Sequence, residues 1–150
     1  MTLTLPQQAF RLDKVCRLFR IQRRGAAAVE FAIVAPLFFL LVMGMIEYGR
    51  MVMVQQVITN ASREGARRAV LDGATTAAVQ STVTNYMTSA KITSPTVTVT
   101  PNPPSGAASG SPITVTVSIP FSQVSWLPTP MYLGAKTLTA TTVMRREGTD

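Results

Sequence analysis

Gly25 and Glu30 could take part in chemistry together, because they stand five residues apart at the start of a long apolar run. Gly25 has no side chain, so it offers a protease cleft a close approach to the backbone. If a peptidase cuts after Gly25, Ala26 becomes a new N-terminus with a free amine, and Glu30 becomes the fifth residue. In a bundle of such helices, the amine of one subunit could neutralise the carboxylate of a neighbour and fix the register between them.

Glu30 has a second, simpler interpretation, which is solvation at the membrane surface. A charged side chain costs about 2.5–3.5 kcal/mol at the centre of a membrane span and less near its end. Glu30 lies one turn into the apolar run, so its carboxylate could reach interfacial water or Arg24. Both interpretations remain open from the residues alone.

The sequence offers few other groups for catalysis or metal binding. It has no histidine, and its one cysteine, Cys16, precedes the apolar run. Imidazole and thiolate metal sites, Ser-His-Asp and Cys-His nucleophiles and disulfides are therefore excluded beyond that run. No phosphate-binding glycine pattern occurs either. We expect no enzyme activity, no cofactor, no catalytic or metal-binding residues, and a free thiol rather than an acylated one at Cys16.

The apolar run covers residues 26–46 and contains one ionisable side chain, Glu30. At about 1.5 Å per residue, a helix of this length spans roughly 30 Å, the thickness of the hydrocarbon core of a bilayer. A buried core helix is the alternative, but the rest of the chain has too little apolar material to surround one. The run therefore predicts a transmembrane helix.

Charge before the apolar run predicts its orientation. The first 24 residues contribute five of the seven net positive charges of the chain. The positive-inside rule then keeps the N-terminus in the cytoplasm and places residues beyond about 47 outside. A cleaved secretory signal would have a shorter apolar region followed by a small-x-small site, which is missing here. We expect a single-pass protein of the inner membrane and no nucleic-acid partner, since topology explains the basic leader better than phosphate binding does.

Residues 47–71 predict an amphipathic continuation of the same helix. Asp72 and Gly73 provide a stop signal, and Glu64 and Arg68 have the spacing of an i, i+4 ion pair. Apolar and small residues recur at helical spacing along one stripe: Met51, Val54, Ile58, Ala61, Gly65 and Ala69. The stripe needs a packing partner.

Residues 72–150 predict a small extracytoplasmic domain that supplies this partner. Thr75 or Thr76 can cap a second helix. Its apolar positions are Val79, Val83, Tyr86 and Ala90. Strand candidates at residues 96–100 and 113–119 alternate apolar and hydroxyl side chains, and a third at residues 136–145 is rich in β-branched residues, though its alternation weakens after Ala140. The expected fold class is α+β, with a long N-terminal helix packed on a small antiparallel sheet of about three strands.

Two loops connect the strand candidates. The first, residues 101–112, is rich in Pro, Gly and Ser and is expected to be flexible. The second contains three prolines and three aromatic residues, Phe121, Trp126 and Tyr132. We expect it to be irregular and to tuck these three rings against the sheet.

The residues around Gly25 resemble a known processing site. The stretch RRGAAAVEF, which ends at Phe31, resembles the prepilin processing site of type IV pilins, where cleavage follows the glycine and Glu is the fifth mature residue. The longer run RRGAAAVEFAIVAPLFFLLVMGMIEYGR, continuing into ASREGARRA, is similar to TadE-like proteins of the tight-adherence (Tad) pilus systems. The similarity covers residues 23–71. It implies a processing site formed by Gly25, Ala26, Glu30 and Phe31.

The resemblance also implies a role and partners. Residues 1–25 would be a basic leader removed by a prepilin peptidase in the membrane. The mature protein would be a minor pilin or pseudopilin in assembly of an adhesive fibre, with other pilin-like subunits, the pilus assembly machinery and the lipid bilayer as partners. Major pilins of these systems are far shorter than this chain of 150 residues, so its length argues against a role as the shaft subunit. The alternative is an uncleaved single-pass envelope protein whose outer domain binds a partner, and cleavage after Gly25 distinguishes the two.

Overall fold

The structure is a computed structural model that describes the backbone of residues 9–127 and 130–147, with side chains from residue 25 onward. The predictions for Cys16 and for the basic side chains of the leader lie outside the described residues. The chain divides into two compact units, Met1–Met43 and Gly44–Asp150. The division falls inside the first helix, and the domain boundaries expected from the sequence stay predictions.

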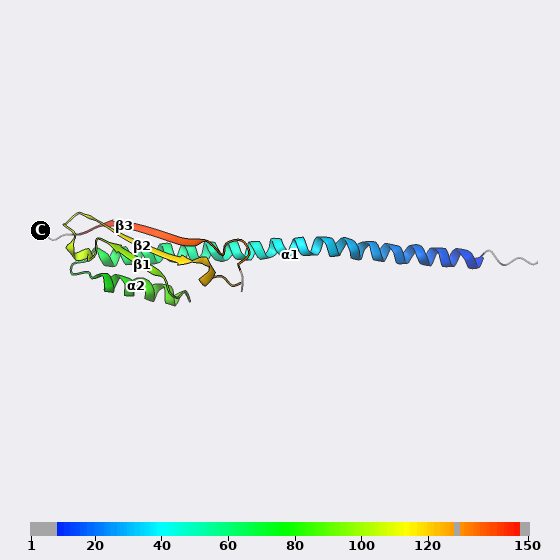
Figure 1. Ribbon diagram of the computed structural model, residues 1–150, viewed down its shortest axis with the longest axis horizontal. Helices are drawn as coiled ribbons and strands as arrows, with labels where there is room; N and C mark the ends of the chain where they lie inside the picture. Colours follow the sequence, from blue (N-terminus) through cyan, green and yellow to red (C-terminus); the bar gives the residue numbers. More distant parts are fainter. Residues whose placement is uncertain (1–8, 128–129, 148–150) are drawn as a thin grey trace, which may run out of the picture. The chain divides into compact units, whose positions relative to one another are not determined.

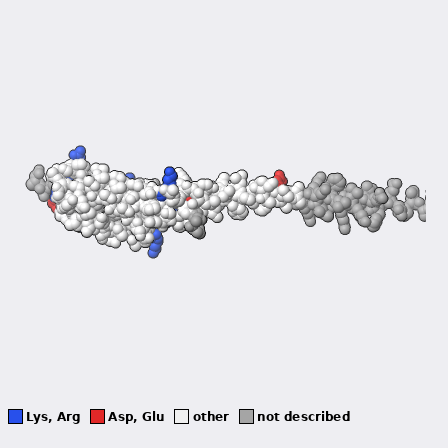
Figure 2. All heavy atoms as spheres, viewed as in Figure 1, with Lys and Arg blue, Asp and Glu red and all other residues white. Residues whose placement is uncertain are grey.

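The first helix, α1 (Ala9–Ala69), carries the apolar run. Its part Gly25–Ala69 is long and apolar enough to cross a membrane, judged by length and composition. No residue from 25 to 46 is buried, and Glu30 is the one charged side chain of that stretch (Figure 2). Pro36 lies inside the helix, a position that membrane helices tolerate more readily than soluble ones.

The later part of α1 buries the predicted stripe. Val54, Ile58 and Ala61 are fully buried, and the helix ends at Ala69, two residues before the expected end. The charge pairing on the exposed face differs from the prediction. Glu64 lies 4.0 Å from Arg67, one turn along the helix, and no ion pair with Arg68 is formed.

The second helix, α2 (Thr76–Ser89), begins and ends with recognisable caps. The Thr75 hydroxyl accepts a hydrogen bond of 3.2 Å from the N–H of Ala78, as the capping prediction required. At the other end Lys91 has a φ of 59° and the N–H of Ile92 bonds to the Met87 carbonyl at 3.0 Å, which is the geometry of a Schellman motif.

The buried face of α2 differs from the predicted one by one residue. Val79 and Val83 are buried as expected, but Met87 is buried in place of Tyr86, which is 38% exposed. Residues four apart follow the helical period closely, so the series from Val79 through Val83 continues to Met87. The long, flexible Met side chain also fills a core gap without a polar group to satisfy.

Three antiparallel strands complete the α+β fold and confirm the predicted class: β1 (Thr96–Thr100), β2 (Pro112–Pro120) and β3 (Thr137–Arg145). Their order is β1-β2-β3, so β2 is central (Figure 1). Alternation separates two faces. Val117 pairs with Val97 and Ala140 on the buried face, while Thr116 pairs with Thr98 and Thr141 on the other. Short 3₁₀ turns, η1 (Pro104–Gly106) and η2 (Phe121–Gln123), lie in the loops.

Gly65 lies at a point of close approach between α1, α2 and the sheet. A Cβ atom placed on Gly65 would lie 2.6 Å from Val83 Cγ2 and 3.3 Å from Val115 Cγ1. Only a glycine allows the backbone of α1 to come this near to both neighbours. The Ser62 and Thr142 hydroxyls form a hydrogen bond of 2.7 Å in the same region, which joins α1 to β3.

Candidate functional site

The four predicted processing residues lie together on one exposed helical segment. Gly25, Ala26, Glu30 and Phe31 are all in α1 and all exposed, and Phe31 is 71% exposed. Since Ala26 and Glu30 are four apart in a helix, they lie on the same face. A Cβ atom on Gly25 would meet nothing within 4 Å. Packing within the chain therefore does not explain a glycine at this position, and the roles of these residues stay predictions.

A second set of residues lies where the exposed stretch of α1 ends, and sequence reasoning missed it. Glu47 is the first buried residue after position 25, with 1% of its surface exposed. Its carboxylate accepts hydrogen bonds from three consecutive backbone N–H groups, those of Met131 and Tyr132 at 3.2 Å and that of Leu133 at 2.7 Å. Hydrogen bonds to an ionised acceptor are about twice as strong as neutral ones. They hold the β2–β3 connection against α1.

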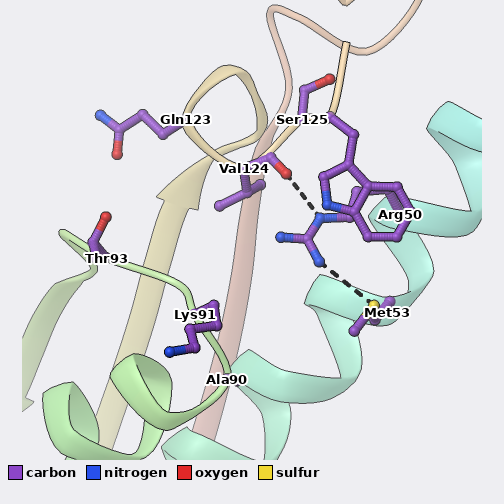
Figure 3. Close-up of a pocket in the computed structure, with 9 residues that line it drawn as sticks. Arg50, Met53, Ala90, Lys91, Thr93, Gln123, Val124 and Ser125 are labelled. Carbon is purple, nitrogen blue, oxygen red and sulfur yellow. Dashed lines mark hydrogen bonds between the residues drawn. The ribbon is translucent and has the colours of Figure 1, made fainter.

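Arg50 holds the same connection one turn further along the helix. It is 8% exposed, and its Nε donates a hydrogen bond of 2.8 Å to the Val124 carbonyl (Figure 3). The guanidinium lies 4.8 Å from the ring centroid of Trp126, within the range of a cation–π interaction. Burial lowers the pKa of the Arg50 guanidinium from its usual value, but arginine remains charged at physiological pH.

This anchoring corrects one expectation for the β2–β3 connection. Phe121 is fully buried as predicted, but Trp126 is 65% exposed and Tyr132 is 60% exposed. The reason is that Glu47 and Arg50 bind the backbone of the connection, which leaves the Trp126 and Tyr132 rings outside the core. A Cβ atom on Gly44 would lie 3.4 Å from Tyr132 Cε2, so the Tyr132 ring rests along α1 instead of on the sheet.

A signal for Glu47 and Arg50 was present in the sequence. An acid that directly follows an apolar run, with a cation three residues on, places two charges on neighbouring faces of one helical turn. Their partners are backbone groups 74 residues away for Arg50 and 84 to 86 residues away for Glu47, which no local pattern reveals.

Arg50 and Trp126 also line a pocket of about 440 Å³ beside the C-terminal end of α2 (Figure 3). Lys91 supplies a second cation, and Met53, Thr93 and Gln123 form other parts of the wall. Among residues 25–127 and 130–147 no three His, Cys, Asp or Glu side chains come together in a way that could hold a metal ion. The pocket lining thus combines two cations and one indole ring with neutral side chains.

Comparison with known proteins gives a match over the part of α1 that contains the four predicted processing residues, Glu47 and Arg50. The family model described as "TadE-like protein" matches residues 25–67, from Gly25 through Glu47 and Arg50 to Arg67. No curated protein and no solved structure matches the chain. The matched segment agrees with the similarity predicted over residues 23–71. Over residues 25–67 the chain is thus similar to TadE-like proteins.

Proposed function

We propose that this protein is a minor pilin or pseudopilin of a Tad-type pilus. It is anchored in the inner membrane by α1, with its N-terminus in the cytoplasm, and a prepilin peptidase removes the leader by cutting after Gly25. One observation carries the proposal above all. The TadE-like match begins at Gly25 itself, the residue expected to precede the cut, and includes Glu30.

The exposure of α1 supports a membrane and subunit-packing role for this helix. Side chains that would be buried in a soluble protein are open here, including Phe31, Ile33, Leu37 and Phe38, each at least 59% exposed. A contiguous apolar surface of this kind marks contact with a membrane or with other proteins. Lipid would cover it before assembly, and the helices of other pilin-like subunits would cover it in a fibre or at its base.

The proposed cleavage hydrolyses the Gly25–Ala26 peptide bond. It leaves a carboxylate on Gly25 and an amine on Ala26, and the peptidase supplies the catalytic groups. The bond lies within α1, so the helix must open locally before a protease can reach it. Glycine in a helix interior costs about 1 kcal/mol relative to alanine, which favours local opening at Gly25.

The test is the N-terminal sequence of the mature protein. The full chain is produced with and without a prepilin peptidase, recovered from membranes and sequenced. We expect Ala26 as the first residue only when the peptidase is present. Gly25→Ala should be cut nearly as well, whereas Gly25→Leu should be cut poorly because its side chain blocks close approach to the backbone.

Gly49→Leu is the matched control, since Gly49 is also an exposed helical glycine with free space around its Cα. It should be cut like the wild type. A membrane-bound protein that still begins at Met1 in a host that makes the pilus would refute the proposal. The uncleaved envelope protein with a partner-binding outer domain would then be favoured.

A further inference from the structure

Three large side chains of the β2–β3 connection lie at the level where α1 leaves its apolar run. That run ends at Ile46, and Glu47, the next residue, holds the backbone of Met131 and Tyr132. The Tyr132 ring reaches further down and lies beside Gly44, inside the run. Because a helix rises about 1.5 Å per residue, Tyr132 lies within a few ångströms of the membrane boundary that the sequence predicts.

The same level carries exposed aromatic and sulfur-containing side chains. Four residues share it, each at least half exposed: Tyr48 (61%), Trp126 (65%), Met131 (51%) and Tyr132 (60%). Together they are called the interfacial cluster. Trp and Tyr are enriched where proteins cross the membrane–water interface, because one end of each ring is apolar and the other forms hydrogen bonds.

We propose that the interfacial cluster docks on the phospholipid surface of the outer leaflet, at the point where α1 leaves the bilayer. The outer domain would then be held against the membrane rather than swing freely on α1. The occupant follows from continuity, since Tyr132 packs on the last turn of a helix stretch whose own surface is suited to lipid. The inference rests on membrane anchoring by α1, but not on cleavage or on pilus assembly.

The hydrogen bonding of this connection suits a place at the edge of the bilayer. Backbone N–H groups are costly to leave unpaired where water is scarce. The N–H groups of Met131, Tyr132 and Leu133 all donate to the Glu47 carboxylate, so none of the three needs water. The same bonds satisfy the carboxylate, which is thereby able to lie next to the hydrocarbon core.

The experiment uses Trp126, which is the only tryptophan of the chain. The full chain is reconstituted into vesicles of phosphatidylcholine and phosphatidylglycerol, with or without lipids that carry bromine on their acyl chains. Tryptophan emission is recorded, and its quenching by bromolipid is compared with its quenching by aqueous acrylamide. We expect bromolipid to quench Trp126 strongly and acrylamide to reach it poorly.

A second single-tryptophan protein provides the matched control, Trp126→Phe combined with Val143→Trp. Val143 is 57% exposed, on the sheet face opposite the core. Its neighbour Thr142 bonds to Ser62, which lies about 22 Å beyond Glu47 along α1. Tryptophan at 143 should respond mainly to acrylamide, with bromolipid quenching lower by about twofold or more.

Further variants test whether the cluster acts as a unit. Met131→Ser with Tyr132→Ser keeps the backbone bonds to Glu47, and it should reduce bromolipid quenching of Trp126. Unchanged bromolipid quenching in that double variant would overturn the docking of the interfacial cluster but not the membrane anchoring. The same conclusion would follow if Trp126 responded to both quenchers like tryptophan at 143. A chain that fails to float with vesicles would overturn the membrane anchoring as well.

Discussion

The Glu47 carboxylate accepts a hydrogen bond of 2.7 Å from the backbone N–H of Leu133, which is 86 residues further along the chain. This bond and its neighbours join the start of the buried part of α1 to the segment that leads into β3. Glu47 is buried and ionisable, so its place in the structure depends on these donors. These hydrogen bonds therefore hold the β2–β3 connection against α1, and they are called the Glu47 contact.

Removing the carboxylate should release the β2–β3 connection from α1. Glu47→Ala leaves three N–H groups without their acceptor, and a lost hydrogen bond to a charged group costs about 1.5–3 kcal/mol. We expect the full chain in detergent to unfold at a clearly lower temperature. Chymotrypsin should also cut faster near Trp126 and Tyr132, which can be followed by mass spectrometry.

Glu47→Gln should fall between Glu47→Ala and the wild type, since its amide oxygen still accepts hydrogen bonds but carries no charge. Glu64→Ala is the control, because Glu64 is exposed and has only a 4.0 Å contact with Arg67. It should leave both readouts unchanged. A Glu47→Ala protein that unfolds at the wild-type temperature and is digested at the wild-type rate would show that the Glu47 contact contributes nothing to stability.

Ile58 tests whether the buried stripe of α1 holds the outer domain. Its side chain is fully buried, and Ile58→Asp would place an unpaired carboxylate in the core at a cost of several kcal/mol. We expect loss of the cooperative thermal transition, measured by near-ultraviolet circular dichroism. Gln56→Asp on the exposed face should unfold like the parent. An unchanged transition in Ile58→Asp would mean that the stripe is not part of the core.

The elements of this fold could be predicted from the sequence because their signals are local. A period of 3.6 indicated the later part of α1 and α2, a period of 2 indicated β1 and β2, and β-branched residues indicated β3. Val54 and Ile58 were assigned to the packing stripe of α1, which is buried. The connection between β2 and β3 could not be predicted in the same way. Its arrangement depends on Glu47 and Arg50, which bind backbone groups far along the chain and leave Trp126 exposed.

The close packing around Gly65 could not be predicted from the sequence for a different reason. Its place on the packing stripe was predicted, but a helical period does not tell how near the neighbouring side chains will come. We expect Gly65→Ala to lower the free energy of unfolding by about 1–3 kcal/mol, since a Cβ atom would lie 2.6 Å from Val83 Cγ2. Denaturant unfolding of the full chain in detergent measures this change.

Gly49→Ala is the control for that substitution, because nothing lies within 4 Å of a Cβ atom on Gly49. Alanine is the better helix former by about 1 kcal/mol, so Gly49→Ala should leave stability equal or slightly higher. If Gly65→Ala also left stability unchanged, α1 would not be closely packed on α2 and β2 at this position.

Glu30 should matter for assembly more than for membrane insertion. It is exposed near the start of the apolar run, where a lone carboxylate hinders insertion, so Glu30→Ala should insert at least as well as the wild type. Under the proposed pairing, the Ala26 amine of a neighbouring subunit meets this carboxylate when helices bundle. Glu30→Ala and Glu30→Gln should then be cut after Gly25 but fail to co-purify with other pilin-like subunits. Glu30→Asp should be intermediate because its reach is shorter. Normal pilus assembly by Glu30→Ala, at wild-type protein levels, would leave Glu30 with a role in peptidase recognition or interfacial solvation alone.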